Sequence, residues 1–506
     1  MNTKGACERM KRISLKKLQK GFAVLCVLAL VLSTLPLYAI AFHNHPYYDD
    51  YGFSASVHQA WRESGSVKAL AQAAFASARN TRMTWQGTYT GTILSNFQPG
   101  VFSESLYWLG TFILLTALIA GFAFFFETLL RRFGMEKWAR MSLNCMAITL
   151  MIQLMPDVGE AFYWFNGGVG NVFIYSLLAL SAALVMRLLA AKGSAVGLTI
   201  ALAVLAVLLG GGSYGGGLFA LCLCAVLLVW LFWKKHEKRW HMSALTLLFL
   251  CCFVYSMAAP GNAVRASVIK YETSAVKTVI LSLYHGVGQL GSYITLPVVA
   301  VTLVMIPALY SAAKRSDWQF DHPWLAAALG VCLYCTQFAP PLYSIASIGA
   351  GRIVNTYYLS FIVLWFVYVY YLLGFIARRV TAELPELDAR RFAALVLVSL
   401  CVLGTGCLAF KRSGDVLYGV QNLSGPSAAL SILTGEAAQY DHEMTQREVL
   451  LNDDSQPVVT LKPLTAVPAV FMDDLIQPDA VYDVRPSLCL YYGKQAILIE
   501  GEVEVP

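Results

Sequence analysis

The sequence predicts an all-α polytopic membrane protein with about eleven transmembrane helices. Hydrophobic residues make up 58% of the 506 residues, charged residues make up only 13%, and the mean hydropathy is +0.59. Soluble globular proteins carry about 25% charged residues, so this composition excludes an ordinary soluble domain. The apolar residues also gather into long runs with little charge, each of a length suited to a hydrocarbon core of about 30 Å.

Eleven apolar runs account for the predicted spans. The first follows the basic segment MKRISLKKLQK and is longer than the apolar region of a secretion signal, so we expect a retained anchor. The predicted spans are 21–42, 105–126, 141–156, 171–186, 194–210, 216–233, 242–259, 288–312, 324–340, 353–377 and 392–410.

The basic residues predict the orientation of the chain, because Lys and Arg of short loops stay on the cytoplasmic side. Residues 1–20 and alternate loops, such as RRFGMEKWAR and KKHEKRW, hold most of the 37 Lys and Arg. We therefore expect a cytoplasmic N-terminus, a membrane domain over 21–410 and an extracytoplasmic segment over 411–506, in the cell inner (plasma) membrane. The net charge of +7 then reflects basic loops beside anionic lipid and argues against nucleic-acid binding.

The first predicted outer loop, residues 43–104, is much longer than the others. It begins with HNHPYYDDYGFS, in which Asp49 and Asp50 lie among aromatic residues where the chain leaves the bilayer. Further on, SVKALAQAAFASAR places apolar residues at helical spacing, which predicts an amphipathic helix along the membrane surface. The apolar face of this helix comprises Val67, Leu70, Ala71, Ala74, Phe75 and Ala78.

The other predicted outer loops are rich in glycine. They are PDVGEAFYWFNGGVGN, GGGSYGGG, APGNAVRASVIK and PPLYSIASIGAGR. Glycine at this density favours either short, broken helices that line a cavity enclosed by protein, or flexible linkers. The sequence leaves both interpretations open.

Charged side chains near the predicted membrane boundary are few and complementary. The acids are Asp49, Asp50, Asp157 and Glu160, and the cations are Arg265, Lys270 and Arg352. A carboxylate accepts a proton from a reacting hydroxyl or amide, and Arg holds a phosphate through two parallel hydrogen bonds. Such a set suits transfer of a group from a lipid phosphate to an acceptor at the outer membrane surface.

This layout resembles the GT-C superfamily of integral-membrane glycosyltransferases, which use polyprenyl-phosphate sugars. The shared features are a first span, a long first outer loop with an acidic pair and a surface helix, and about ten further spans. The motifs DDYGFS, WQGTYTG, FYWFNGGVGN and APGNAVR are similar in order and spacing to an uncharacterised family of bacterial multispanning membrane proteins near that superfamily. The resemblance covers roughly residues 20–410.

The resemblance implies an inverting glycosyltransferase that moves a sugar from a polyprenyl-phosphate donor to an extracytoplasmic glycan, lipid or protein. Asp49 or Asp50 would be the catalytic base, with Asp49 favoured as the first acid of the pair, and Arg265 or Arg352 would hold the phosphate. Thr88 departs from the basic residue expected after the WQG turn. The other residues expected to bind donor or acceptor are Lys270, Asn262, Trp85, Tyr89, Glu160 and Trp164.

Other interpretations of these residues remain open. The two Asp residues suit the N-terminus of a helix starting near Gly52, and the arginines suit anchors at the membrane interface. No cofactor and no metal site is predicted, although a divalent cation is compatible with the acids. Histidines that would be its ligands are His43, His45 and His58.

Two other functions fit the same cations. A transporter or flippase of lipid-linked saccharide would bind the phosphate without cleaving the donor. It would also need a polar path for the saccharide through the membrane, and the nearly charge-free spans count against such a path. A ligase that moves whole glycans from a polyprenyl-diphosphate carrier would share the chemistry of a glycosyltransferase.

The C-terminal segment, 411–506, differs from the rest in being acidic and less apolar. Its stretches QPVVTLKP, DAVYDV and KQAILIEGEVEV favour β structure. We expect a small extracytoplasmic α/β or β domain packed over the outer loops.

Overall fold

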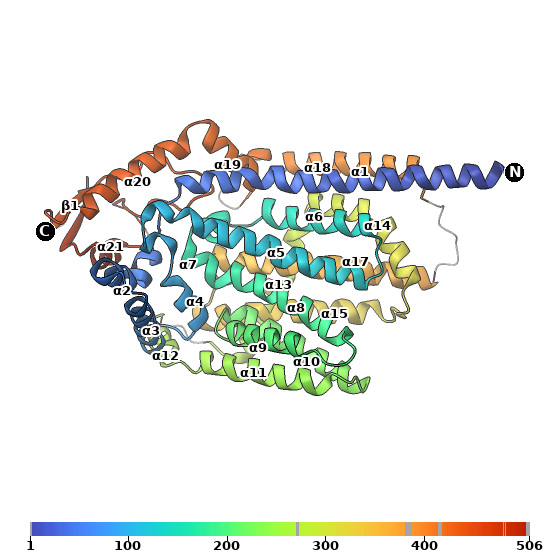
Figure 1. Ribbon diagram of the computed structural model, residues 1–506, viewed down its shortest axis with the longest axis horizontal. Helices are drawn as coiled ribbons and strands as arrows, with labels where there is room; N and C mark the ends of the chain where they lie inside the picture. Colours follow the sequence, from blue (N-terminus) through green and yellow to red (C-terminus); the bar gives the residue numbers. More distant parts are fainter. Residues whose placement is uncertain are drawn as a thin grey trace.

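The computed structural model describes residues 3–269, 273–379, 387–412, 417–478, 480 and 482–501. Helices dominate this part of the chain, and most of them run along the long axis of the molecule (Figure 1). The two ends of the chain lie at opposite ends of that axis (Figure 1). The helical class predicted from the sequence is therefore confirmed.

Within the described ranges, nine helical segments are long and apolar enough to cross a membrane, which supports a multi-pass membrane protein. The 3₁₀ turn η6 (Thr336–Phe338) and the short helix α16 (Ala339–Ile345) extend one of them, after α15. The main helices of these segments are α1 (Thr3–Ile40), α5 (Trp108–Arg132), α8 (Ile174–Ala190), α10 (Tyr214–Trp233), α11 (Arg239–Met257), α14 (Leu296–Arg315), α15 (Pro323–Cys335), α17 (Gly351–Arg379) and α18 (Ala389–Leu408).

The other two predicted spans, 141–156 and 194–210, are shorter helices. They correspond to α6 (Lys137–Gln153) and α9 (Val196–Gly210), which have 17 and 15 residues. A helix needs about 20 residues to cross the hydrocarbon core without thinning it. Both nevertheless pack against long apolar helices, α6 against α1 and α9 against α11.

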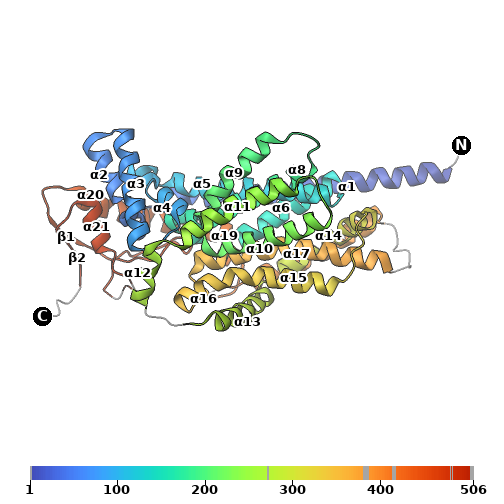
Figure 2. The same ribbon diagram turned by 90° about the horizontal axis from the view of Figure 1, so that it is seen from below.

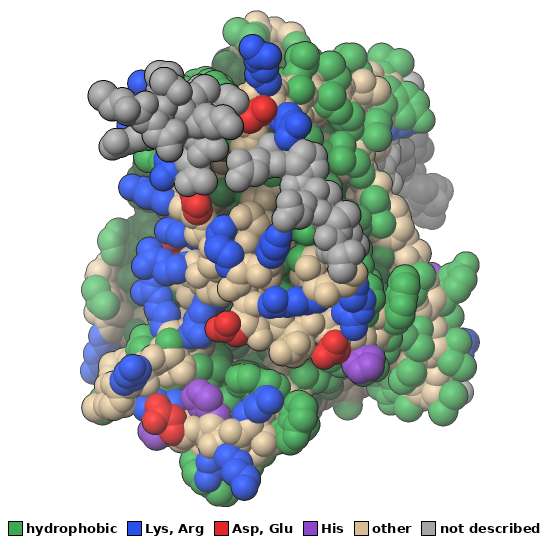
Figure 3. Space-filling model, turned by 90° about the vertical axis from the view of Figure 1, so that its right-hand side faces the viewer, with side chains coloured by type: hydrophobic (Ala, Val, Ile, Leu, Met, Phe, Trp, Pro, Cys, Tyr) green, Lys and Arg blue, Asp and Glu red, His purple; other side chains and the backbone are tan. Residues whose placement is uncertain are grey.

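Lys and Arg side chains gather at the end of the molecule where α1 begins (Figure 3). Several long helices end there with a pair of cations in the last turn, which also suits the negative end of the helix dipole. These pairs are Arg131 and Arg132 of α5, Lys314 and Arg315 of α14, and Arg378 and Arg379 of α17.

Short helices cover the opposite end of the bundle, beyond the ends of α5 and α11 (Figures 1 and 2). Among them, α3 packs against both α2 and α12. The covering elements are η1 (Ala41–His43), α2 (Asp49–Ser64), α3 (Val67–Thr84), α4 (Tyr89–Ser95), η2 (Pro99–Val101), η3 (Glu104–Leu106) and α12 (Pro260–Ile269). Helix α13 (Ala275–Tyr293) follows α12 and packs beside α15 and α16.

Helix α3 is the amphipathic helix predicted in the first outer loop, but only part of its apolar face is buried. Leu70 and Ala74 are buried in a small cluster with Val57 of α2. Val67 and Phe75, on the same predicted face, are 80% and 66% exposed. Exposed apolar side chains at this end of the molecule suit contact with the membrane interface.

The glycine-rich loop 156–171 forms a broken helix. Two π-helical turns, η4 (Gly159–Tyr163) and η5 (Val169–Phe173), flank the single turn α7 (Phe165–Gly168). A Cβ at Gly168 would lie 2.5 Å from the carbonyl oxygen of Ala161, so the close approach of these turns requires glycine. Of the two interpretations left open for this loop, the structure has the broken helix.

The described C-terminal segment contains more helix than predicted. It comprises η7 (Val420–Asn422), α19 (Ser424–Leu433), α20 (Glu436–Asn452), β1 (Val458–Leu461), α21 (Arg485–Tyr492) and β2 (Ala496–Ile499). The two strands pair in parallel, with Val458 opposite Ala496. They lie in two of the three predicted β stretches, whereas the described residues of DAVYDV form no strand. Helix α21 packs on α2, and α19 on α1.

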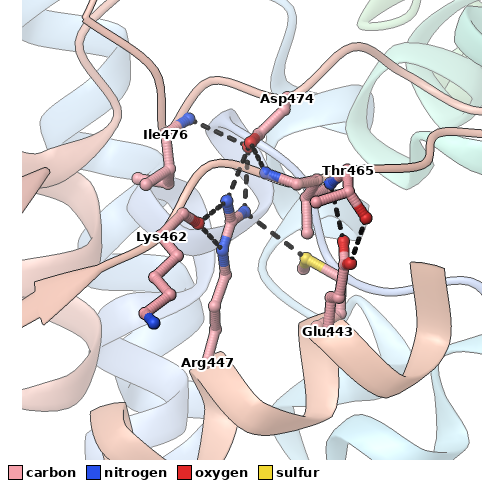
Figure 4. A network of polar contacts seen from close by, with 8 residues as sticks. Glu443, Arg447, Lys462, Thr465, Asp474 and Ile476 are labelled. Carbon is pink, nitrogen blue, oxygen red and sulfur yellow. Dashed lines mark hydrogen bonds and ion pairs between the residues drawn. The ribbon is translucent and has the colours of Figure 1, made fainter. Parts of the chain in front are cut away.

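A buried ion pair fixes α20 to the chain that follows β1 (Figure 4). The Arg447 guanidinium donates to both carboxylate oxygens of Asp474, at 2.8 and 2.7 Å, and its Nε donates to the Lys462 carbonyl at 3.0 Å. Both side chains of the pair are less than 10% exposed. Two parallel charge-assisted bonds fix the geometry more strictly than a single contact does.

Candidate functional site

The acidic pair lies in the first turn of α2, which starts at Asp49, three residues before the helix start near Gly52 that the sequence left open for these acids. Tyr48 is the residue before the helix, with φ 44° and ψ −108°, and no side chain caps the helix there. Successive helical residues point about 100° apart, so Asp49 and Asp50 still face different surroundings. Negative charge in the first turn also suits the helix dipole.

Asp50 is fully buried and accepts three hydrogen bonds. Its Oδ2 accepts from the Tyr47 N–H at 3.1 Å and from the Tyr107 hydroxyl at 2.5 Å, and its Oδ1 accepts from the Asn166 N–H at 2.9 Å. Burial raises the pKa of this carboxyl to about 7, against the effect of the three donors. Asp50 therefore holds the start of α2 against α5 and the broken helix.

Asp49 differs from its neighbour because it accepts no hydrogen bond from the described residues. Its side chain is partly buried, and burial raises the pKa of the carboxyl to about 6, while Arg352 and Arg265 act in the opposite direction. Asp49 is thus a carboxylate that titrates near neutrality within electrostatic reach of two guanidinium groups. Groups with these properties are candidates for proton transfer.

Arg352 lies at the start of α17, as the sequence predicts. Its backbone N–H and its Nη1 both donate to Glu160 Oε2, at 2.7 and 3.0 Å. The guanidinium carbon lies 4.9 Å from the centre of the Trp164 ring, a cation–π contact. The side chain keeps 31% of its surface exposed, so Glu160 positions the cation without enclosing it.

Arg265 comes from α12 and lies over the ring of Trp85, at 5.0 Å. Its Nη1 contacts Gln86 Oε1 at 3.4 Å, whereas its Nε is buried and has no hydrogen-bond partner in the described part of the chain. Burial, and then the charge of Arg352, lower the pKa of this guanidinium. Two cations held close together, one with an unused buried donor, form a place for an anion.

Trp164 supplies a second buried donor without a partner among the described residues, its indole Nε1. The ring is only 3% exposed and packs beside Tyr47 and Tyr48, with ring centres 5.8 and 6.1 Å away. Buried donors are usually paired in native structures, so this indole N–H, beside the cation–π contact with Arg352, is available to a polar group that enters the site.

Asp157 holds Glu160 and the start of α17 in place. Its Oδ1 accepts from the Glu160 N–H at 2.8 Å, and its backbone forms two hydrogen bonds with the Asn355 side chain, of 2.9 and 2.6 Å. A Cβ at Gly351 would lie 2.1 Å from Asp157 Oδ2, so the carboxylate lies where only glycine leaves room. These contacts fix Glu160, and therefore Arg352, against the first turn of α17.

Two of the predicted site residues, Asn262 and Tyr89, bond other parts of the chain. Asn262 uses its side chain within the loops: Oδ1 accepts from the Tyr214 hydroxyl at 2.8 Å, and Nδ2 donates to the Ser256 and Met257 carbonyls. The Tyr89 hydroxyl donates to the Val207 carbonyl at 2.5 Å, beside α9. Lys270 lies outside the described residues. Neither Asn262 nor Tyr89 is therefore among the residues that we propose to bind the donor or the acceptor.

Sequence reasoning missed Tyr107 and Gln86. Tyr107 lies within the apolar run of the second span. Nothing in the neighbouring sequence indicates that its hydroxyl bonds Asp50, 57 residues away. Gln86 is part of WQGTYTG, which drew attention to Trp85 and Tyr89 instead.

The three histidines considered as metal ligands do not form one group. His43 and His45 both contact Asp441 of α20, at 3.2 and 2.8 Å. His58 stacks on Tyr491, with ring centres 3.9 Å apart.

Comparison with known proteins gives no assignment: no family model, no curated protein and no solved structure matches the chain significantly.

Proposed function

We propose that this protein is an inverting glycosyltransferase of the GT-C type, which transfers a sugar from a polyprenyl-phosphate donor to an extracytoplasmic acceptor. The observation that carries the proposal is the placement of Asp49, a carboxylate with no hydrogen bond from the described residues, within electrostatic reach of Arg265 and Arg352. A base and two phosphate-binding cations are the groups that this reaction needs.

Asp49 removes the proton from the acceptor as the acceptor atom bonds to the anomeric carbon. The bond from that carbon to the phosphate oxygen breaks on the opposite face of the sugar, which inverts the configuration. Polyprenyl phosphate leaves with an added negative charge. Arg265 and Arg352 stabilise this charge, and the buried Nε of Arg265 supplies a donor that does not have to give up another partner.

The site lies at the end of the bundle opposite the basic end (Figures 1 and 3). Since basic loops face the cytoplasm, the proposed site faces the extracytoplasmic side of the plasma membrane. A polyprenyl chain in the outer leaflet would bring its phosphate to the height of α3 and α12, where apolar side chains such as Phe75 are exposed. This position supports a lipid-borne donor over a soluble nucleotide sugar.

A density map of the protein purified with its membrane lipids, and supplied with polyprenyl phosphate in excess, tests the proposal. The phosphate should lie between Asp49 and the guanidinium groups of Arg265 and Arg352. A map in which the phosphate binds elsewhere, or nowhere, would contradict it. Transport is tested separately in liposomes, where a polyprenyl-phosphate sugar that the protein carries across the membrane with its sugar intact would instead indicate a transporter of lipid-linked saccharide.

A further inference from the structure

A second polar cluster joins the first outer loop to the C-terminal segment. His45 and Glu104 are 7% and 9% exposed, and Glu448 is partly buried. A ring nitrogen of His45 and one carboxylate oxygen from each glutamate all lie within 4.8 Å of one another. The three residues come from before α2, from η3 and from α20, so only the fold brings them together.

The two nitrogens of His45 have different surroundings. Nε2 lies 2.8 Å from Asp441 Oδ1 and donates to it in the tautomer that this bond favours. Nδ1 is buried and has no hydrogen-bond partner among the described residues. A histidine that binds a metal usually donates its other ring N–H to a carboxylate, which fixes the tautomer and orients the ring. His45 has this arrangement, with Nδ1 as the nitrogen left for a ligand.

Space for an ion exists beside the glutamates. Glu104 and Glu448 line a cavity of about 50 Å³ between α2 and α20, which is more than a water molecule needs. Pro46, the residue after His45, also lines this cavity, whereas His45 itself does not. The other charged groups lining it are Arg447, Asp473 and Asp474. Arg447 is neutralised by its two bonds to Asp474, so the remaining charge around the cavity is negative.

The surroundings fix the positions of the glutamates. The Tyr492 hydroxyl donates to Glu104 Oε1, and a hydrogen bond joins the Glu104 carboxyl to that of Glu448, so the two acids already lie in contact where an ion would replace the proton between them. On α20, Arg447 pairs with Asp474, and Glu443 accepts hydrogen bonds from the Thr465 N–H and hydroxyl; these contacts hold the turn that precedes Glu448 (Figure 4). Rigid elements that present converging side chains are what a selective metal site requires.

We propose that His45 Nδ1, Glu104 and Glu448 bind a divalent transition-metal ion of the Zn²⁺ or Mn²⁺ class, with Asp441 as the residue that positions His45. One imidazole and two carboxylates favour such ions over Mg²⁺ or Ca²⁺, which prefer oxygen ligands alone. The ion would tie α20 to the chain four residues before Asp49. This proposal does not depend on the glycosyltransferase assignment.

Metal content of the full-length protein in detergent tests the proposal. The protein is stripped with a chelator, loaded with Zn²⁺, freed of unbound ion and analysed by elemental mass spectrometry. We expect one Zn²⁺ per chain in the unaltered protein, and close to none in His45→Gln and Glu448→Gln. Mg²⁺ in the same protocol should not be retained.

His442→Gln is the matched control, because His442 also lies on α20 but its side chain bonds Gln446 at the surface. It should keep the ion, and Asp441→Asn should bind Zn²⁺ about 10 to 100-fold more weakly. An unaltered protein that retains no Zn²⁺ would overturn the proposal even if the variants fold poorly. Retention of the full equivalent by both His45→Gln and Glu448→Gln would also overturn it.

Discussion

The hydroxyl of Tyr107 donates a 2.5 Å hydrogen bond to Asp50, and its oxygen accepts one of 3.1 Å from the Phe165 N–H. This contact joins the first outer loop, the start of α5 and the broken helix at one buried point. It also separates the roles of two adjacent acids. Asp50 is held by the scaffold, whereas Asp49, next to it on α2, accepts no hydrogen bond from the described residues and lies within electrostatic reach of Arg265 and Arg352.

Asp50→Asn should destabilise the protein, because an amide cannot accept hydrogen bonds on both sides. At least one of the donors from Tyr47, Tyr107 and Asn166 loses its acceptor, which costs about 1–3 kcal/mol when the donor stays buried. Thermal unfolding in detergent measures the change. Asp454→Asn is the control, since Asp454 is 75% exposed and pairs with Arg62 at the surface. Equal unfolding midpoints for both variants would refute the structural role of Asp50.

Replacement of the two arginines should weaken binding of polyprenyl phosphate. Each charge-assisted bond to the phosphate contributes about 1.5–3 kcal/mol, so Arg265→Ala or Arg352→Ala should lower affinity by about 10 to 100-fold. Lys should restore part of the loss, because it keeps the charge but not the paired donors. Binding to the protein in nanodiscs measures this, with Arg62→Ala as the control. Unchanged affinity in both Ala variants would leave the arginines as interface anchors.

The short helices α6 and α9 should cross the membrane together with the nine longer segments, because each lies along a long apolar helix. Reporter fusions on the two sides of α6, at Gly134 and Pro156, should report cytoplasm and exterior respectively, and the same compartment for both would show that α6 does not cross. The total of eleven crossings is odd, which places the two ends of the chain in different compartments. Reporter fusions at Lys20 and after Lys411 should therefore report cytoplasm and exterior respectively. The same compartment for both fusions would overturn the odd count and the shared outer face of the site and the C-terminal segment.

Most of the membrane domain was predictable because hydropathy is a local property that any run of about 20 residues displays. The same signal located α6 and α9 to within about four residues at each end, although both helices fall short of the roughly 20 residues that cross the hydrocarbon core without thinning it. In the C-terminal segment, β propensity located both strands. It missed α20, whose many polar residues hide its helical period and whose position depends on the Arg447–Asp474 pair.

The site was only partly predictable, because its contacts join residues far apart in the sequence. Charge near the membrane boundary identified Asp49, Asp50, Arg265 and Arg352. It gave no indication that Arg352 would pair with Glu160, 192 residues away. One interpretation of the acidic pair was a helix starting near Gly52, and the structure has that helix three residues earlier, with Asp50 held by donors from Tyr107 and Asn166 that the sequence does not place beside it.

The rate of sugar transfer should rise with pH as Asp49 ionises. A base must be deprotonated to accept a proton, and the pKa of Asp49 is raised by burial to about 6. The acid limb of kcat/KM should therefore have its midpoint near pH 6, with the reaction slow at pH 5 and level above pH 7. A rate that does not change between pH 5 and pH 8 would exclude a base with this pKa.

Sugar transfer by Asp49→Asn is the most direct test of the proposed mechanism. The unaltered and variant proteins are supplied, in native membrane lipid with its acceptors, with a panel of polyprenyl-phosphate sugars, and release of polyprenyl phosphate is measured. The unaltered protein should consume at least one donor, and Asp49→Asn should do so about 10² to 10⁴-fold more slowly while unfolding at the same temperature. Consumption of no donor by the unaltered protein, or equal rates for both proteins, would contradict the account.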